Sequence, residues 1–234
     1  MLIKSLNQFL FVIFPYIAVV LMLVVSLYRY FNNSYKFSSL SSEFLEADKL
    51  FWGSVPWHYG ILTVLGGHVL AFLFPKEFIA FGSVPIRLLI LEVTALIFGL
   101  LALFGLVMLI HRRLTHPRIK VVTSKMDLLV LFFLLVQTGS GVGTAVSYRW
   151  GSIWYAHSMV PYLKSLLCFK PDLLYLASMP WLVKVHVVNA FLIIAFLPFT
   201  RLVHFLVLPV PYIWRAWQVV IWNYDRKKIR KTDR

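Results

Sequence analysis

Apolar residues in this chain gather into long runs, which shorter polar or basic stretches separate. A run of about 20 mostly apolar residues is long enough to cross the hydrocarbon core of a membrane as a helix. Five runs are this long, and we predict a transmembrane helix for each, at residues 7–31, 52–74, about 85–111, about 126–148 and 184–204. The pattern indicates an all-α integral membrane protein. Residues 1–208 would form one five-helix domain, and residues 209–234 a basic, aromatic tail.

The stretches between the predicted helices contain most of the polar residues. Residues 32–50 are rich in serine and acidic residues, and residues 111–120 are strongly basic. We expect loops at both places and a short loop at residues 75–85. Residues 149–180 form the longest expected loop, with tryptophan and tyrosine residues suited to a membrane interface.

Composition supports the membrane assignment. Of the 234 residues, 60% are hydrophobic and 14% are charged, whereas soluble domains have about 45–50% apolar and about 25% charged residues. The mean hydropathy is +0.81. With a single cysteine, Cys168, this chain by itself cannot form an internal disulfide, a thiolate-bound iron–sulfur cluster or a multi-cysteine zinc site.

The basic residues are distributed unevenly between the two sides that five helices would define. The side with residues 32–50, residues 112–125 and the C-terminus carries 16 of the 23 lysines and arginines. Because basic residues gather in cytoplasmic loops, we predict a multi-pass protein of the cytoplasmic membrane. Its C-terminus would be cytoplasmic and its N-terminus outside.

Four histidines lie within two of the predicted helices. His58 and His68 are in the second, and His186 and His204 are in the fifth. The last two are 18 residues apart, which is five turns of a continuous helix, so they would share one face at a separation of about 27 Å. His58 and His68 would be about 15 Å apart. Pro198 lies between the histidines of the fifth helix and could bend it.

Antiparallel helices would bring these histidines together in pairs at two depths. His68 would face His186 near the outer surface, and His58 would face His204 near the inner surface. Each pair could supply both axial ligands of a b-type haem iron, which needs no CxxCH attachment motif. We therefore predict a bundle that holds two b haems.

Three other interpretations compete with haem binding. A membrane histidine can simply be a hydrogen-bonded packing residue. A proton relay usually needs intramembrane carboxylates, and the nearest candidates, Glu92 and Asp127, lie close to helix ends. A metal transporter would need acidic or cysteine ligands nearer the middle of the membrane. The remaining histidines lie at helix ends or in loops, and we do not expect them to be ligands: His111, His116 and His157.

Several other residues have two interpretations each. Four arginines at inner helix ends are either a topology signal or partners of haem propionates, for which a guanidinium is well suited: Arg29, Arg112, Arg113 and Arg201. Gly66 and Gly67 precede His68 and could admit either a flat ligand or a neighbouring helix.

Several motifs resemble one known family. They are FPYIA and RY in the first span, PWHYGILTVLGGH in the second, RRLTHPRIK after the third, Asp127 and Gln137 in the fourth, and VHVVNAFLIIAFLPFTRLVHFLVLPVPY at the end. These motifs follow the order found in the gamma subunit of respiratory nitrate reductase, a dihaem cytochrome b, and they extend over nearly the whole chain.

The resemblance implies a five-helix membrane anchor with defined cofactors and partners. His58 and His204 would bind the inner haem, and His68 and His186 the outer one. Quinol from the membrane pool would be oxidised near the outer haem. Electrons would then pass to an iron–sulfur beta subunit and a molybdenum-containing alpha subunit, where nitrate is reduced in anaerobic respiration or in nitrate assimilation. The catalytic nitrate site would therefore not be on this chain.

The quinol site differs from the family pattern at one position. Leu89 occupies the place of a lysine, and Arg87 is the nearest cation. Gly67 and Arg87 are accordingly the candidate quinol contacts. Two other functions remain open: the equivalent dihaem subunit of a sulfite-reductase-associated or heterodisulfide-reductase-like complex, and a haem-free transporter or anchor.

Overall fold

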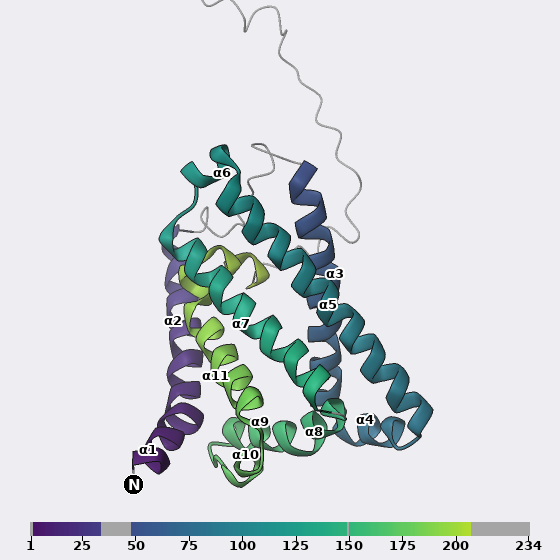
Figure 1. Ribbon diagram of the computed structural model, residues 1–234. Helices are drawn as coiled ribbons and strands as arrows, with labels where there is room; N and C mark the ends of the chain where they lie inside the picture. The colour runs from purple at the N-terminus through teal and green to yellow at the C-terminus, as the bar shows by residue number, and fades with distance from the viewer. Residues whose placement is uncertain (1, 34–47, 149, 207–234) are drawn as a thin grey trace, which may run out of the picture.

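The computed structural model describes residues 2–33, 48–148 and 150–206, and this part of the chain is helical and contains no strands. Its long helices lie side by side and slant past one another (Figure 1). The N-terminal end of the described chain and the end at residue 206 lie at opposite ends of the bundle (Figure 1). This arrangement is what an odd number of spans produces. The predicted tail, residues 209–234, lies outside the described residues.

A long apolar helix lies at each of the five predicted spans, and four or five of them are candidate membrane spans. The first consists of α1 (Leu2–Gln8), the π-helical turn η1 (Phe9–Ile13) and α2 (Phe14–Asn33). The others are α3 (Asp48–Leu73), α5 (Pro85–Thr115), α7 (Lys125–Ser147) and α11 (Trp181–Phe196). Four of the spans are long and apolar enough to cross a membrane on their own, and the fifth candidate is α3 taken together with α4, Pro75–Gly82, a pair bent by 108°.

Three expected loops contain helix. Most of the expected loop at residues 75–85 forms α4, Pro75–Gly82, and Pro117–Val121 in the basic stretch forms the single turn α6. Most of the expected loop at residues 149–180 is also helical. It contains α8 (Gly151–Trp154), the π-helical turn η3 (Tyr155–Met159), α9 (Val160–Leu167) and α10 (Leu174–Ala177). The loop prediction was wrong here because short helices can be stabilised by packing on the bundle, without a long apolar run of their own.

The fifth helix does not continue to His204. α11 ends at Phe196, and two 3₁₀ helices follow, η4 at Leu197–Phe199 and η5 at Arg201–Leu206. Pro198 lies in η4, where its missing N–H and its ring prevent the α-helix from continuing. The prediction of one continuous helix that carries both His186 and His204 was therefore wrong.

The bundle has two separate hydrophobic cores. One joins the first span to α9 and α11, and its buried members include Phe11, Tyr162 and Phe191. The other joins α3 to α5, around Trp57 and Leu106. α7 packs against both α5 and α11 and so connects the two groups of helices. His58 and His68 therefore belong to the group of α3 and α5. His186 and His204 belong to the group of the first span, α9 and α11.

Glycine allows α3 and α5 to pack very closely. A Cβ atom added to Gly60 would come within 2.5 Å of the Ala102 backbone nitrogen, and one added to Gly105 within 2.4 Å of the Trp57 nitrogen. Two helix backbones approach this closely only where a side chain is missing. Gly60 and Gly105 therefore fix the position of α3 against α5.

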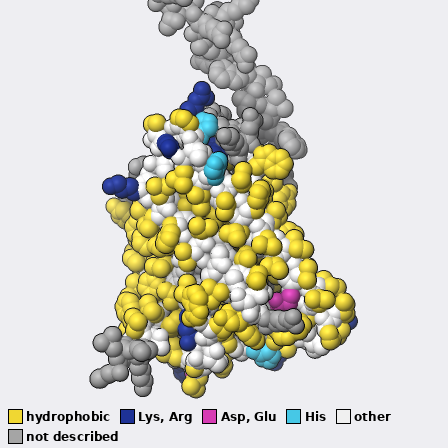
Figure 2. All heavy atoms as spheres, viewed as in Figure 1, with side chains coloured by type: hydrophobic (Ala, Val, Ile, Leu, Met, Phe, Trp, Pro, Cys, Tyr) yellow, Lys and Arg dark blue, Asp and Glu magenta, His cyan; other side chains and the backbone are white. Residues whose placement is uncertain are grey.

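Apolar side chains cover the flank of the molecule. In the view of Figure 2, hydrophobic side chains cover the middle of the bundle, and the lysines and arginines lie towards its two ends. Many large hydrophobic residues of the long helices are exposed, among them Val20, Leu62 and Ile90. A surface of this kind suits contact with lipid.

Candidate functional site

The two histidines of α3 are oriented in the same way. His58 Nδ1 lies 2.7 Å from the Ser54 carbonyl oxygen, and His68 Nδ1 lies 2.8 Å from the Val64 carbonyl oxygen. A ring nitrogen that donates to a carbonyl leaves the other nitrogen, Nε2, with the lone pair that a metal requires. Both rings are therefore placed so that Nδ1 can donate to a carbonyl, as the rings of many metal-binding histidines do. Both side chains are also exposed, outside the buried contact of α3 with α5.

The glycines before His68 do not pack against another helix. A Cβ atom added to Gly66 or Gly67 would meet no atom within 4 Å in the described part of the chain. The helix-packing interpretation of this pair was therefore wrong. A flat ligand beside Gly67 stays a prediction, and Gly60 has the packing role instead.

His186 of α11 lies in a polar network with α7. Its Nδ1 is 3.0 Å from Ser140 Oγ, and its Nε2 is 3.0 Å from Gln137 Nε2. Asn189 donates to Gln137 Oε1 at 2.8 Å and to the Phe133 carbonyl at 2.9 Å. Because this network holds Gln137 in place on an otherwise apolar helix face, it also fixes the position of the His186 ring.

Small residues of α7 give His186 room. A Cβ atom on Gly141 would come within 3.1 Å of His186 Cε1, and one on Gly143 within 3.1 Å of Leu182. These two glycines confirm the expectation that this stretch makes close helix contacts. At Gly139 a Cβ atom would meet nothing within 4 Å in the described part, so the expectation was wrong there.

His204 is held in a different way, because it lies on the 3₁₀ helix η5. Its Nδ1 is 2.7 Å from the carbonyl oxygen of Arg201. As in His58 and His68, the bond to a carbonyl leaves Nε2 available as a ligand. His204 therefore has ligand geometry despite the break in the helix.

The two histidine pairs, His68 with His186 and His58 with His204, stay predictions. His68 and His186 are close enough to interact electrostatically. His58 precedes His68 on α3, in the direction of α6, and η5 lies at that same end (Figure 1). α3 and α11 share no extended packing interface among the described elements. A group bound by a histidine from each would lie between the two helix groups.

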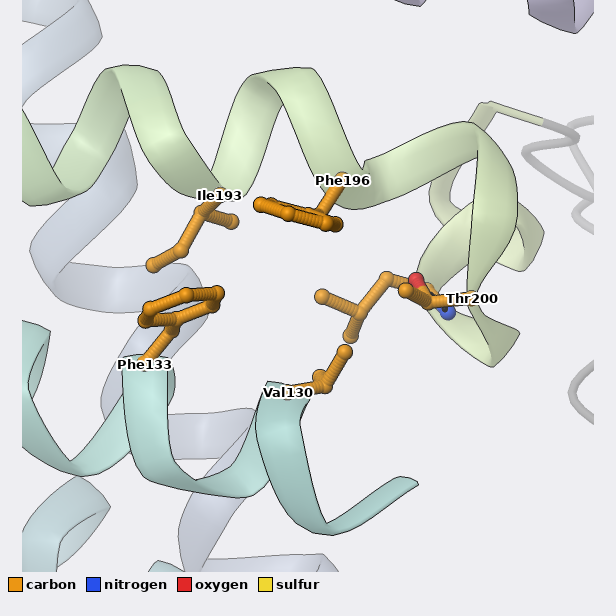
Figure 3. Close-up of a pocket in the computed structure, with 6 residues that line it drawn as sticks. Val130, Phe133, Ile193, Phe196 and Thr200 are labelled. Carbon is orange, nitrogen blue, oxygen red and sulfur yellow. Dashed lines mark hydrogen bonds between the residues drawn. The ribbon is translucent and has the colours of Figure 1, made fainter. Parts of the chain in front are cut away.

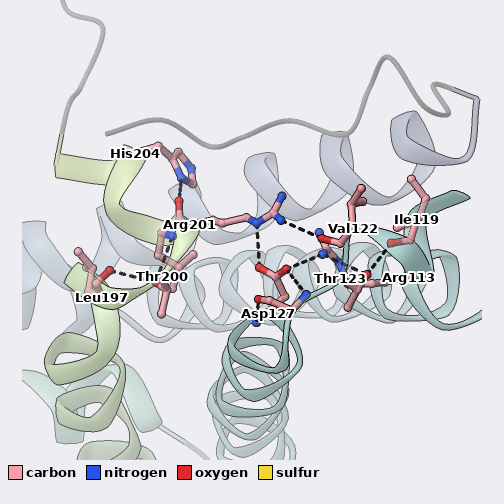
Figure 4. A network of polar contacts seen from close by, with 11 residues as sticks. Arg113, Ile119, Val122, Thr123, Asp127, Leu197, Thr200, Arg201 and His204 are labelled. Atoms are coloured by element: carbon pink, nitrogen blue, oxygen red, sulfur yellow. Dashed lines mark hydrogen bonds and ion pairs between the residues drawn. The ribbon is translucent and has the colours of Figure 1, made fainter. Parts of the chain in front are cut away.

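Asp127, at the start of α7, lies at the centre of a polar cluster beside His204 (Figure 4). Its Oδ2 is 3.1 Å from Arg113 Nη1, and its Oδ1 is 2.9 Å from Arg201 Nε. It also forms a capping box with Ser124. Only 9% of Asp127 is exposed. Sequence reasoning considered Asp127 for a proton relay and did not foresee this ionic contact between three elements.

The four arginines proposed for haem propionates have the following surroundings. Arg113 and Arg201 pair with Asp127. Arg29 donates to the carbonyl oxygen of Pro198, and Arg112 is buried, with 3% of its surface exposed. A propionate role for these residues stays a prediction.

Tyr155 is a residue that sequence reasoning assigned only to the membrane interface. Its hydroxyl donates to the His68 carbonyl oxygen at 3.2 Å, and its ring lies edge-on to the His68 ring, with 4.8 Å between centroids. Burial raises the pKa of the Tyr155 hydroxyl to about 12, so it remains a donor at neutral pH. No local motif could have identified it, since it is 87 residues from His68.

The predicted quinol contacts lie near the start of α5. Arg87 is exposed, with its guanidinium carbon 5.7 Å from the centre of the Phe81 ring. Leu89 is also exposed. Nearby, α4, α5 and α8 surround an open surface hollow of about 370 Å³, lined mainly by apolar side chains that include Leu88, Trp150 and Trp154.

Glu92, the other proton-relay candidate, has a structural partner. Its Oε1 accepts from the backbone N–H of Ser152 at 2.9 Å and also from the Ser152 hydroxyl. This contact ties the start of α8 to α5. It also holds the wall of the hollow in place, because Trp154 belongs to α8.

A second pocket lies between α7 and the end of α11 (Figure 3). Phe133 and Phe196 face one another across it, with Val130 and Ile193 beside them (Figure 3). It has no room for a water molecule and no polar lining surface. It is therefore part of the packing between α7 and α11.

We did not expect the remaining histidines to be ligands. His111 and His157 are exposed, and His116 precedes α6. Within the described ranges, no three His, Cys, Asp or Glu side chains gather as ligands of a single metal ion. An axial pair at a haem iron needs only two protein ligands, so the four candidate histidines remain.

Comparison with known proteins gives consistent matches. The family model described as nitrate reductase gamma subunit matches residues 7–223. The nitrate reductase gamma chain of Bacillus subtilis is 34% identical over 91% of this chain and 97% of its own length. The respiratory nitrate reductase 1 gamma chain of Escherichia coli is 30% identical over 93% and 98%. A nitrate reductase-like protein of Mycobacterium tuberculosis is 27% identical over 90% of this chain but only 33% of its own length.

Proposed function

This chain belongs to the nitrate reductase gamma subunit family, and from that premise we propose that it is the dihaem electron-transfer subunit of a respiratory nitrate reductase. It anchors an iron–sulfur beta subunit and a molybdenum alpha subunit to the cytoplasmic membrane. It oxidises quinol on the side of α4 and α8 and delivers electrons at the side of α6, which we place in the cytoplasm.

One observation carries the haem assignment. His58, His68 and His204 each bond through Nδ1 to a backbone carbonyl, which leaves Nε2 as the ligand atom. His58 and His68 lie on one helix group, whereas His186 and His204 lie on the other. The residues present therefore fit two bis-histidine haems between the groups, with His68 and His186 at the outer site and His58 and His204 at the inner one.

His186 fits the same site after one local change. Gln137 Nε2 lies 3.0 Å from His186 Nε2, the atom that would face a metal. A turn of the Gln137 amide away from the ring would free Nε2, and Ser140 would still contact Nδ1. Ser140 therefore orients the outer ligand.

The chain's residues have the following roles. When bound, the two haems supply one-electron transfer between the ends of the bundle. At the outer end, Arg87 offers a cation to a quinol oxygen, and the neighbouring hollow beside Leu88 accepts apolar ring or tail atoms. Quinol oxidation releases two protons as well as two electrons, and exposed groups at this end can pass the protons to water.

The relatives favour nitrate reductase over the other complexes. The relatives from Bacillus subtilis and Escherichia coli are named as nitrate reductase gamma chains. The relative from Mycobacterium tuberculosis is named as a nitrate reductase-like protein. We therefore place nitrate reduction on a partner subunit and keep a sulfite-reductase-associated or heterodisulfide-reductase-like complex as the alternative. A haem-free transporter or anchor is the other alternative, and an optical spectrum separates it from both.

Reoxidation of the haems tests the proposal. Membranes containing the chain and its partner subunits are reduced with a quinol, and the b-haem absorption bands are followed after nitrate is added. We expect prompt reoxidation by nitrate and none by sulfite. A membrane without b-haem bands would contradict the haem assignment. Haems that quinol reduces but nitrate cannot reoxidise would support a different complex.

A further inference from the structure

The position of His204 depends on a segment that is not a regular α-helix. α11 ends at Phe196, and His204 lies on the 3₁₀ helix η5. Its Nδ1 is bonded to the carbonyl oxygen of Arg201, at 2.7 Å. The ring therefore follows any movement of the Arg201 backbone.

Arg201 is in turn tied to elements distant in sequence. Its Nε lies 2.9 Å from Asp127 Oδ1, and its Nη2 donates to the Val122 carbonyl oxygen at 3.1 Å. Figure 4 shows the chain of contacts from His204 through Arg201 to Asp127. These contacts hold η5 against the start of α7.

Asp127 does more than cap its own helix. A capping box requires only the reciprocal bonds between Ser124 and Asp127, at 2.9 and 3.1 Å. Asp127 in addition pairs with two guanidinium groups, those of Arg113 and Arg201. Without its negative charge these two cations would repel one another in a poorly solvated place, and breaking a buried pair is costly.

We infer that Asp127 is a positioning residue for the inner haem ligand, acting on His204 through Arg201. The inference rests on the proposed function, because it concerns a haem held by His58 and His204. Asp127 touches neither the haem nor the quinol in this account. Its effect should therefore be confined to the inner haem.

Two substitutions separate this role from helix capping. Asp127→Asn keeps an oxygen that can accept from the Ser124 N–H, but it removes the charge that attracts the arginines. Ser124→Ala removes the hydroxyl half of the capping box and leaves both ion pairs. Asp127→Glu restores the charge on a longer side chain and is the conservative variant.

The test is a redox titration of the assembled complex, with electron paramagnetic resonance spectra of both haems. His204→Ala and His186→Ala identify the inner and outer signals. In Asp127→Asn we expect a shifted inner-haem potential and spectrum, with about tenfold or greater loss of haem retention at that site, as is typical when a residue that orients a ligand is removed. The outer haem should be unchanged, Ser124→Ala should resemble the wild type, and Asp127→Glu should recover part of the inner signal.

Three results of the titration would overturn the inference. They are an unchanged inner haem in Asp127→Asn, an equal change of the inner haem in Ser124→Ala, and an equal change of both haems in Asp127→Asn. If Asp127→Asn assembles poorly, hydrogen exchange at residues 197–206 gives a second measurement: faster exchange than in Ser124→Ala supports the inference, and equal exchange overturns it. A wild-type complex with no haem would overturn the proposed function as well, so the two failures are distinguishable.

Discussion

Tyr155 lies edge-on to His68, with 4.8 Å between the ring centroids, and its hydroxyl donates to the His68 carbonyl oxygen. The contact joins η3 to α3 at the end of the bundle that carries α4 and α8. An edge-to-face contact between rings fixes the plane of both. Tyr155 therefore restricts rotation of the candidate outer ligand, although it is far from it in sequence.

Substitution of Tyr155 should alter the outer haem. We expect Tyr155→Leu, which removes the ring, to shift the potential and spectrum of the outer haem, while Tyr155→Phe has a smaller effect. The pKa of about 12 keeps the hydroxyl protonated, so these effects should not vary across the neutral pH range. Tyr148→Leu is the control, because Tyr148 packs on Trp154 at the same end. Identical outer-haem spectra in Tyr155→Leu and in the control would contradict the prediction.

A second prediction concerns the close packing of α3 on α5. Gly60→Ala places a Cβ atom 2.5 Å from the Ala102 nitrogen, so the helix backbones must move apart. We expect a loss of about 1–3 kcal/mol, as in other overpacked sites, measured by thermal unfolding in detergent.

Gly139→Ala is the matched control for this substitution. Its Cβ atom meets nothing within 4 Å in the described part, and alanine is the better helix former by about 1 kcal/mol. This variant should be as stable as the wild type or more stable. A Gly60→Ala protein that unfolds at the same temperature as Gly139→Ala would show that the two helices are less tightly packed than described.

Arg87 tests the quinol site. Arg87→Ala should slow reduction of the haems by quinol at least several-fold, while dithionite still reduces both haems. Lys76→Ala is a control that removes a different cation at the same end of the bundle. If the rate of reduction by quinol is the same in both variants, Arg87 does not contact the quinol.

Much of the architecture could be predicted from the sequence, and the reasons are physical. A membrane helix must be long and apolar, so the five runs mark the four or five candidate spans. The pairing of His68 with His186 follows from antiparallel order alone and stays a prediction. A bend at Pro198 was also foreseen, but not that the α-helix ends at Phe196, because Leu197 and Phe199 are as apolar as the helix before them.

The contacts that sequence reasoning missed share one property. The partners of Tyr155 and Asn189 lie 52 to 87 residues away on other elements. Arg201, a partner of Asp127, lies 74 positions from it. Such contacts depend on how helices are arranged, and a pattern along one helix does not contain that information. Helix α4 was missed for a related reason: it is too short to stand out as a periodic segment.

The C-terminal tail provides a prediction that the described residues do not test. Residues 209–224 combine proline with tryptophan and tyrosine, and basic residues follow. Aromatic anchors beside arginine favour protein contacts. Truncation after Pro209 should release the partner subunits while haem remains, whereas truncation after Tyr224 should release far less. Full co-purification with the shorter chain would place docking on residues 32–50 and 112–125 instead.

The haem content of single-histidine variants tests the central claim most directly. The wild-type complex should contain two b haems per chain, measured from the reduced-minus-oxidised spectrum against protein concentration. His58→Ala and His204→Ala should each lose the inner haem, and His68→Ala and His186→Ala should each lose the outer one. His157→Ala, at an exposed position on η3, should keep both. Two haems retained in any of the four variants, or the same haem lost from His58→Ala and His68→Ala, would contradict the account.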